Sequence, residues 1–170
     1  MSKDMQGYED VTVYGLTDAR EQELITKQIE CNFIWTNKDG HGLGVIMNYI
    51  AKDGSIWLTA TSQRARIKAL KRDPRASVVI SSMGTDMGPG KTVTYKGRVN
   101  IHDDQATKDW FYPAMAKIIS PYPAPTEEAA LVHLDTPLRV VLELVPEKAI
   151  KFDGDAIAKS SREGSIPSGS

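Results

Sequence analysis

The sequence predicts a mainly β protein of the α+β class, in which helices lie around an antiparallel sheet. Short segments with alternating apolar residues recur along the chain, and strong turn signals separate them at residues 37–40 and 52–54. Tight turns connect antiparallel neighbours, whereas parallel strands need long crossovers. With 170 residues, of which 41% are hydrophobic, the chain is long enough to bury the core of one domain.

The first half of the chain is expected to form one helix and three strands. Apolar residues recur at helical spacing after Thr17 and Asp18, either of which can cap the helix. From Cys31 onward the apolar residues alternate with polar ones, and β-forming residues dominate. The expected elements are a helix over 17–30 and strands over 31–36, 43–51 and 55–60. Because tight turns join the strands, we expect an antiparallel meander.

The second half is expected to alternate helices and strands less regularly. A run of good helix formers ends at Asp73-Pro74, and prolines at 121, 123 and 125 stiffen a later connector. The expected elements are helices over 62–73, 104–119 and 127–133 and strands over 76–82, 92–101 and 139–145. Beyond Gly154 the apolar pattern is lost. We therefore predict a domain over residues 1–154 and a flexible tail over 155–170.

Charge and cysteine content indicate a cytoplasmic protein. The formal net charge is −1, so no global field attracts nucleic acid or anionic lipid. Cys31 is the single cysteine and cannot form an intramolecular disulfide, which fits a reducing compartment and a buried structural thiol. No apolar run approaches the ~18 residues that a membrane span needs. We expect neither a membrane nor a nucleic-acid partner.

Several motifs that would indicate other chemistry are incomplete. The segment from Gly84 to Lys91 has five residues between Gly84 and Gly90, whereas a P-loop has four, and a strand follows it. It is therefore a hairpin loop and not a P-loop. His41, His102 and His133 lack ligand spacing, so no metal site is expected. The chain has no Gly-x-Ser-x-Gly elbow, which argues against a serine hydrolase. No catalytic side chain is expected.

The informative segment is the basic stretch over residues 59–75. It carries six cations between Arg64 and Arg75 against the single acid Asp73, an excess of +5. A strand ends there at hydroxyl residues and a helix begins, so free backbone N–H groups and the positive end of the helix dipole lie beside the arginines. This arrangement suits a phosphate. A solvated helix face explains the same charges equally well, and nucleic-acid backbone binding explains them less well.

The order of these segments resembles the pyridoxamine 5′-phosphate oxidase-like split-barrel flavoproteins. The resemblance covers most of residues 17–150 and is closest to the flavin- and deazaflavin-dependent oxidoreductase branch. Its specific part is the Arg64 to Val79 block, preceded by Thr59-Ala60-Thr61-Ser62 and followed by the strand that contains Tyr95-Lys96-Gly97-Arg98-Val99. The resemblance implies an antiparallel split barrel, a homodimer and a cofactor in a groove between the subunits.

The resemblance also implies a set of cofactor-binding residues. Strand-end hydroxyls and basic residues at the helix start would hold the phosphate, a neighbouring strand would lie along the ring system, and Lys68 would meet a polyanionic tail. The matching positions are Met47, Asn48, Thr59, Thr61, Ser62, Arg64, Arg66 and Lys68. FMN and the deazaflavin coenzyme F-420 both fit, and the Arg-Ala-Arg-x-Lys pattern is closer to the deazaflavin branch.

The function implied by the resemblance is an oxidoreductase that transfers hydride to a small organic acceptor. Hydride chemistry belongs to the ring of the cofactor, so the protein needs only to position that ring and to exclude water. Residues 151–170 contain no Trp and only Arg162, unlike the C-terminal segment of pyridoxamine phosphate oxidases proper. The alternative is a non-catalytic module that sequesters a flavin or binds nucleic acid through the basic helix.

Overall fold

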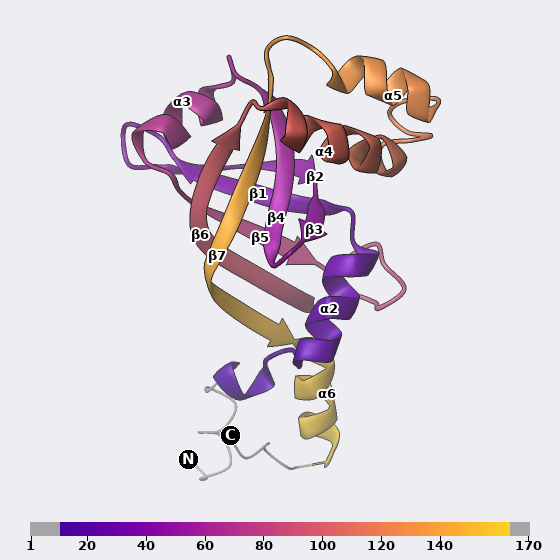
Figure 1. Ribbon diagram of the computed structural model, residues 1–170. Helices are drawn as coiled ribbons and strands as arrows, with labels where there is room; N and C mark the ends of the chain where they lie inside the picture. Colours follow the sequence, from indigo (N-terminus) through magenta and orange to yellow (C-terminus); the bar gives the residue numbers. More distant parts are fainter. Residues whose placement is uncertain (1–10, 164–170) are drawn as a thin grey trace. The chain divides into compact units, whose positions relative to one another are not determined.

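The computed structural model describes residues 11–163 as a mixture of helices and one sheet (Figure 1). The helices are the 3-10 helix η1 (Val11–Tyr14), α2 (Asp18–Lys27), α3 (Ala65–Arg72), α4 (Gln105–Ile118), α5 (Glu127–Leu134) and α6 (Gly154–Glu163). The strands are β1 (Glu30–Thr36), β2 (Gly42–Asn48), β3 (Ile50–Lys52), β4 (Ser55–Thr61), β5 (Arg75–Ser81), β6 (Lys91–His102) and β7 (Arg139–Asp153). The predicted mainly β class is confirmed.

The seven strands form one sheet in the order β2-β1-β5-β6-β7-β4-β3. The pairs β1·β2, β1·β5, β3·β4 and β4·β7 are antiparallel. The prediction of one strand over 43–51 is wrong, because the chain leaves the sheet at Tyr49 and continues on the other edge as β3. The three predicted strands are therefore two hairpins, and the predicted meander of adjacent strands does not form. The side chain of Tyr49, at the break between β2 and β3, is buried.

The chain divides into two compact units. Within the described residues, the smaller unit comprises 11–28, 80–94 and 149–163, and the larger unit comprises 29–79 and 95–148. Strands β5, β6 and β7 contribute residues to both units. Each unit has its own set of buried contacts.

Ion pairs and a buried hydroxyl pair hold the smaller unit together. Arg20 Nε donates to Asp153 Oδ2 at 2.7 Å, and the buried Lys91 pairs with Asp155 at 2.7 Å. The hydroxyl groups of Tyr14 and Ser160 lie 3.3 Å apart. Asp155 and Ser160 belong to α6, so the segment predicted as a tail is helical as far as residue 163. Residues 164–170 of that predicted tail lie outside the described residues.

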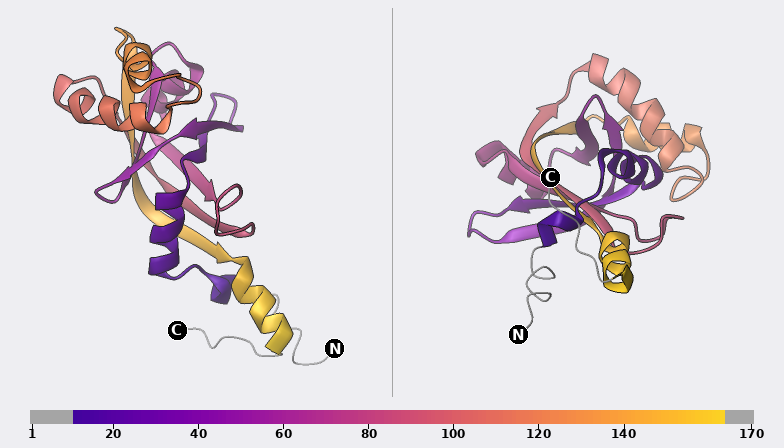
Figure 2. Two further views of the ribbon diagram at one scale, coloured as in Figure 1. Left: turned by 90° about the vertical axis from the view of Figure 1, so that its right-hand side faces the viewer. Right: turned by 90° about the horizontal axis from the view of Figure 1, so that it is seen from below.

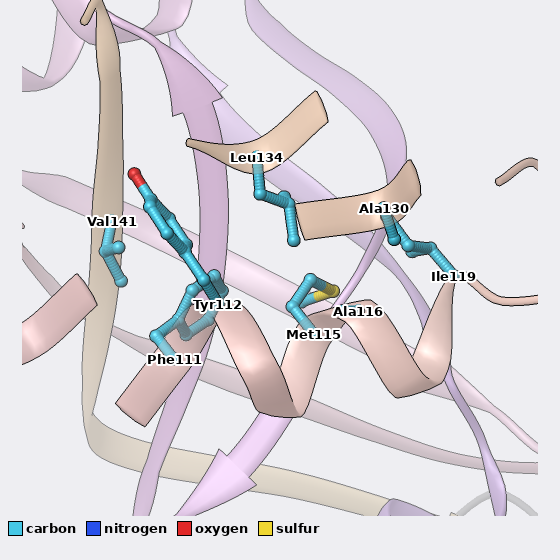
Figure 3. Close-up of a cluster of buried hydrophobic side chains, with 8 residues drawn as sticks. All are labelled: Phe111, Tyr112, Met115, Ala116, Ile119, Ala130, Leu134 and Val141. Carbon is cyan, nitrogen blue, oxygen red and sulfur yellow. The ribbon is translucent and has the colours of Figure 1, made fainter. Parts of the chain in front are cut away.

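Helices α4 and α5, with Val141 of β7, form one buried apolar cluster of the larger unit. Asp104 and Thr126 cap these helices, each by accepting a hydrogen bond from a backbone N–H three residues on. The two helices lie side by side in both views of Figure 2. Figure 3 shows Ala130 and Leu134 of α5 turned toward α4. The cluster comprises Phe111, Tyr112, Met115, Ala116, Ile119, Ala130, Leu134 and Val141.

The single cysteine is part of the apolar interior of the larger unit. Cys31 is 3% exposed, as predicted for a structural thiol. Burial, with a smaller contribution from Glu30, raises the pKa of its thiol to about 12. The group is therefore a neutral thiol at physiological pH and not a nucleophile. Within residues 11–163, no helix is both long enough and apolar enough to cross a bilayer.

Candidate functional site

A cavity of about 200 Å³ lies in the larger unit where the basic helix, two strand ends and the α4–α5 pair meet. Its walls are mostly apolar, with two guanidinium groups, an amide, a hydroxyl and an imidazole among them. The lining residues are Met47, Asn48, Thr59, Arg66, Met115, Ile119, Pro123, His133, Leu134 and Arg139. No carboxylate lines this cavity, so its charge is positive.

The register of β4 and β7 explains how distant parts of the sequence meet here. Thr59 pairs with Val141 and Thr61 pairs with Arg139, so the end of β4 faces the first residue of β7. The connection is reinforced just beyond the strands, where the N–H of Ser62 donates to the carbonyl of Leu138 at 2.7 Å. Helix α3 begins four residues after Thr61 and carries Arg66 in its first turn. Arg66 and Arg139 therefore line one cavity although they are 73 positions apart in the sequence.

Both cavity arginines carry a buried nitrogen that has no acceptor. Within the described part of the chain, only three buried side-chain polar atoms lack a hydrogen-bond partner: Nε of Arg66, Nε of Arg139 and the hydroxyl of Tyr112. All three groups are donors at neutral pH. A buried unsatisfied donor costs about 1–3 kcal/mol, and more when it is charged. Both arginines line one cavity, where an anionic ligand would supply acceptor oxygens to their guanidinium groups.

The two arginines at the cavity carry positive charges that no carboxylate in its lining neutralises. Burial lowers the pKa of Arg66, and the nearby charge of Arg64 lowers it further. Burial also lowers the pKa of Arg139, where Tyr112 acts in the opposite direction and Arg64 again lowers it. Arginine stays protonated in proteins, so burial first and the charge of Arg64 second make each of these positions unfavourable for a cation. A bound anion would reverse the effect.

The structure brings four of the eight predicted site residues to this cavity. Met47, Asn48, Thr59 and Arg66 line it. The hydroxyl of Thr59 donates to the carbonyl of Val140 at 2.8 Å, so its proton is already used and its oxygen can only accept. The amide of Asn48 donates to the carbonyl of Ile29 at 3.3 Å. Of the polar groups among these four, the guanidinium of Arg66 and the second amide hydrogen of Asn48 remain available as donors.

The other four predicted residues lie outside the lining of the cavity. Thr61 is half-buried at the end of β4, and Arg64 and Lys68 are exposed. Ser62 lines a different cavity, of about 370 Å³, together with Lys71, Arg139 and six other residues. Arg64 is the residue before α3, whose N-terminus has no side-chain cap. Its first-turn N–H groups thus lack the usual side-chain acceptor.

Sequence reasoning missed six lining residues. They are Met115, Ile119, Pro123, His133, Leu134 and Arg139. A charged residue that opens an otherwise apolar strand was visible at Arg139, but its pairing with Thr61 was not. The α4–α5 residues have the pattern of ordinary core positions, and only the tertiary arrangement shows which of them border a cavity.

A second polar cluster of the larger unit lies around Glu143. Its carboxylate accepts from Ser55 at 3.1 Å and Asn100 at 3.1 Å, and lies 3.0 Å from Nε2 of His102. Trp57 contacts His102 with ring centroids 5.4 Å apart. Within residues 11–163, no group of three or more metal-ligating side chains is placed to hold an ion.

The comparisons with known proteins agree with this architecture. The family model described as pyridoxamine 5′-phosphate oxidase matches residues 20–152. The chain belongs to this family, whose fold is the split barrel, and the predicted family and fold are confirmed. Among curated proteins, none matches the chain.

Three solved structures show the range of similar proteins. A conserved hypothetical protein from Mycobacterium tuberculosis is 19% identical, with a TM-score of 0.68 over 81% of this chain and 85% of its own. An F-420 reductase is 16% identical, with a TM-score of 0.60 over 76% of this chain and 94% of its own. An FAD-binding protein from Mesorhizobium loti is 18% identical, with a TM-score of 0.60 over 80% of this chain and 92% of its own. These likenesses show a shared fold.

Proposed function

We propose that this chain binds a phosphate-bearing flavin-type cofactor, either FMN or coenzyme F-420, and serves as a cytoplasmic oxidoreductase that passes hydride to a small organic acceptor. The observation that carries the proposal is the buried, unpartnered Nε of Arg66 in a cavity without a carboxylate. Membership of the pyridoxamine 5′-phosphate oxidase family supports a phosphate-bearing ligand. The bound cofactor would supply the hydride chemistry.

Different residues of the cavity would contact different parts of the cofactor. Arg66 would hold the phosphate through charge-assisted hydrogen bonds, and the N–H groups of Ala65 and Arg66 at the start of α3 would add donors. Met115, Ile119 and Leu134 would exclude water from the adjoining part of the ligand. Met47 and Asn48, at the end of β2, would border the ligand where its ring system begins.

The cavity has room for only part of such a cofactor. Its volume of about 200 Å³ is below the ~300–1,000 Å³ that is usual for small-molecule sites. The phosphate end would occupy it, and the ring would extend beyond. We therefore propose a homodimer in which the partner subunit supplies the remaining walls of the site.

Between the two cofactors, the exposed charges of α3 favour coenzyme F-420. Arg72 and Arg75 have partners, the carbonyl of Thr36 and the carboxylate of Asp73. Within the described part of the chain, Arg64, Lys68 and Lys71 form no hydrogen bond or ion pair through their side chains. Cations without partners beside a phosphate site suit a ligand with a polyanionic extension.

The decisive experiment is to titrate the purified protein with FMN and with F-420 and to record absorption and fluorescence. Binding of one of them, followed by reoxidation of its reduced form by an organic acceptor on the enzyme, would establish the function. Binding without any turnover across a panel of acceptors would favour a sequestering module. Failure to bind either cofactor would refute the proposal.

A further inference from the structure

We propose that Arg139 is a ligand-binding residue that holds the same anionic group as Arg66. This assignment rests on the proposed function, because the anion is taken to be the phosphate of the cofactor. Arg139 comes from β7, far in sequence from the basic segment that carries Arg66. It gives the site a second guanidinium from a different structural element.

The surroundings of Arg139 do not account for it as a structural residue. Its Nη2 donates to the carbonyl of His133 at 3.1 Å, but its buried Nε has no acceptor. No ion pair joins it to any carboxylate of the described residues. A half-buried arginine without a counterion lowers the stability of the fold. Binding of an anion by Arg139 would explain why an arginine occupies this position despite the loss of stability.

The backbone of Arg139 is fixed in the position that binding requires. Its N–H donates to the carbonyl of Thr136 at 2.9 Å, and its neighbour Leu138 accepts from the N–H of Ser62 at 2.7 Å. In the sheet Arg139 pairs with Thr61, at the end of the strand that leads into α3. The guanidinium is therefore presented beside the start of the basic helix without a rearrangement of the chain.

The charge of the cluster indicates the chemical class of the ligand. Arg66 and Arg139 line one cavity that has no acid, and the field of Arg64 reaches both. Guanidinium forks pair with the oxygens of phosphate in two parallel hydrogen bonds. Two guanidinium groups that belong to residues lining one cavity suit a phosphate group that carries or adjoins a second negative charge. The site should thus discriminate strongly between FMN and riboflavin, which differ only in the phosphate.

The test compares four variants of the full chain with the wild type. Arg139→Ala removes the proposed contact, Arg139→Lys keeps the charge without the fork, and Arg66→Ala removes the first arginine. Lys117→Ala removes one exposed charge from α4 and serves as the matched control. Dissociation constants are measured for FMN and riboflavin, and the thermal shift caused by inorganic pyrophosphate is measured without any flavin.

Arg139→Ala should weaken FMN binding by about 10- to 150-fold, the effect of losing a charge-assisted hydrogen bond. Riboflavin binding should change by less than about threefold, because the missing contact is to the phosphate. Arg139→Lys should fall between the wild type and Arg139→Ala. If Arg139→Ala does not fold, Arg139→Lys alone decides, since a lysine that binds FMN as tightly as the arginine contradicts a forked contact.

The outcomes separate this assignment from the proposed function. An Arg139→Ala protein that binds FMN like Lys117→Ala, while Arg66→Ala loses affinity, overturns the role of Arg139 and leaves the function standing. If the wild type binds neither FMN nor F-420 but pyrophosphate raises its melting temperature, and this rise is lost in Arg139→Ala, the anion site stands and the proposed cofactor function falls. If Arg139→Ala shows the same thermal shift with pyrophosphate and the same FMN affinity as the wild type, the assignment is refuted.

Discussion

Arg64 and Arg66 lie two positions apart in the sequence, yet their surroundings differ. Arg64 is exposed before the first turn of α3, whereas Arg66 is half-buried and lines the cavity. A contact inside a cavity is screened far less by solvent and salt than a charge at the surface. The two residues, which the sequence treats as equivalent candidates, should therefore contribute unequally to binding.

Arg66→Ala should weaken binding of the cofactor by about 10- to 150-fold, and Arg64→Ala by less, because Arg64 acts through its field across exposed surface. Titration of each variant at two salt concentrations checks this, with Lys117→Ala as the control. The small effect of Arg64→Ala should shrink further at high salt. Equal and small effects at both arginines would instead support a solvated helix face.

Catalysis should not depend on any cysteine or histidine. Cys31 is buried with a raised pKa, His41 is exposed in a turn, and His102 is held by Glu143. His133 lines the cavity, but hydride transfer needs no side-chain acid when water supplies the proton. Alanine at each position should keep the rate within about tenfold, a barrier change below ~1.4 kcal/mol.

Stopped-flow reoxidation of the reduced cofactor measures this rate apart from cofactor loading. His133→Ala is the most demanding of these variants, because His133 is the one histidine at the cavity. A thousandfold loss there, with unchanged cofactor affinity, would show that a general acid had been overlooked.

At the scale of secondary-structure elements, Glu143 connects three strands. Glu143 lies on β7. Its carboxylate contacts Ser55 of β4 and both Asn100 and His102 of β6. Burial alone would raise the pKa of Glu143, but the hydrogen bonds from Asn100, His102 and Ser55 outweigh it and lower the pKa below the ordinary 4.5. The cluster therefore stabilises the sheet only while the carboxylate is ionised.

The stability that Glu143 contributes should be complete above the unfolded-state pKa and should be lost as the pH falls through the lowered folded-state value. Glu143→Gln should cost about 1–3 kcal/mol at pH 7, and less at low pH. Urea unfolding at pH 7 and at pH 3 checks this. Glu147→Gln is the control, since that carboxylate forms an exposed pair with Arg98. Equal losses in both variants would contradict the role of the cluster.

Strands β6 and β7 approach each other closely at Gly97. A Cβ at this position would overlap the carbonyl oxygen of Val145 and lie 3.0 Å from Cα of Pro146. Since both obstacles are backbone, Gly97→Ala should destabilise the fold by about 1–3 kcal/mol or more. Gly42→Ala, where the nearest atom is 4.0 Å away, should change stability by less than about 0.5 kcal/mol. Thermal unfolding of both variants provides the comparison.

Local pattern predicted most elements, and it failed where tertiary contacts decide. Helix α3 and strands β4 and β5 follow from periodicity, turn residues and the Asp73-Pro74 break, and Arg66 follows from charge and resemblance. The bend at Tyr49 was not visible, because β-forming residues continue through it. Helix α6 was missed since its polar composition suggests a tail, while Tyr14 contacts its Ser160. Arg139 could not be found without the β4–β7 register.

At the scale of the whole molecule, the sheet has two free edges, β2 and β3. On β2, Leu43 is 41% exposed and Ile46 is 65% exposed. Apolar side chains on an edge strand favour pairing with another chain. Together with a cavity too small for the whole cofactor, these residues support the proposed homodimer.

Light scattering should give a mass of twice 18.7 kDa. Ile46→Lys should shift the protein toward the monomer, because it places a charge in the proposed interface, while Val132→Lys on the exposed face of α5 should not. A monomer that binds the cofactor at full affinity would refute the dimeric site. Dissociation by Val132→Lys and not by Ile46→Lys would move the interface to α5.

Arg64, Arg66 and Arg139, which pair with no carboxylate of the described residues, have a consequence for the fate of the chain in a cell. A ligand that binds only the folded form adds stability as RT ln(1 + [L]/Kd), about 2.7 kcal/mol at a hundredfold excess over Kd. The ligand-free chain gives up stability to its uncompensated charges and spends more time unfolded, where proteases act. The abundance of this protein would then follow the supply of its anionic ligand, so that chains made without it are degraded sooner.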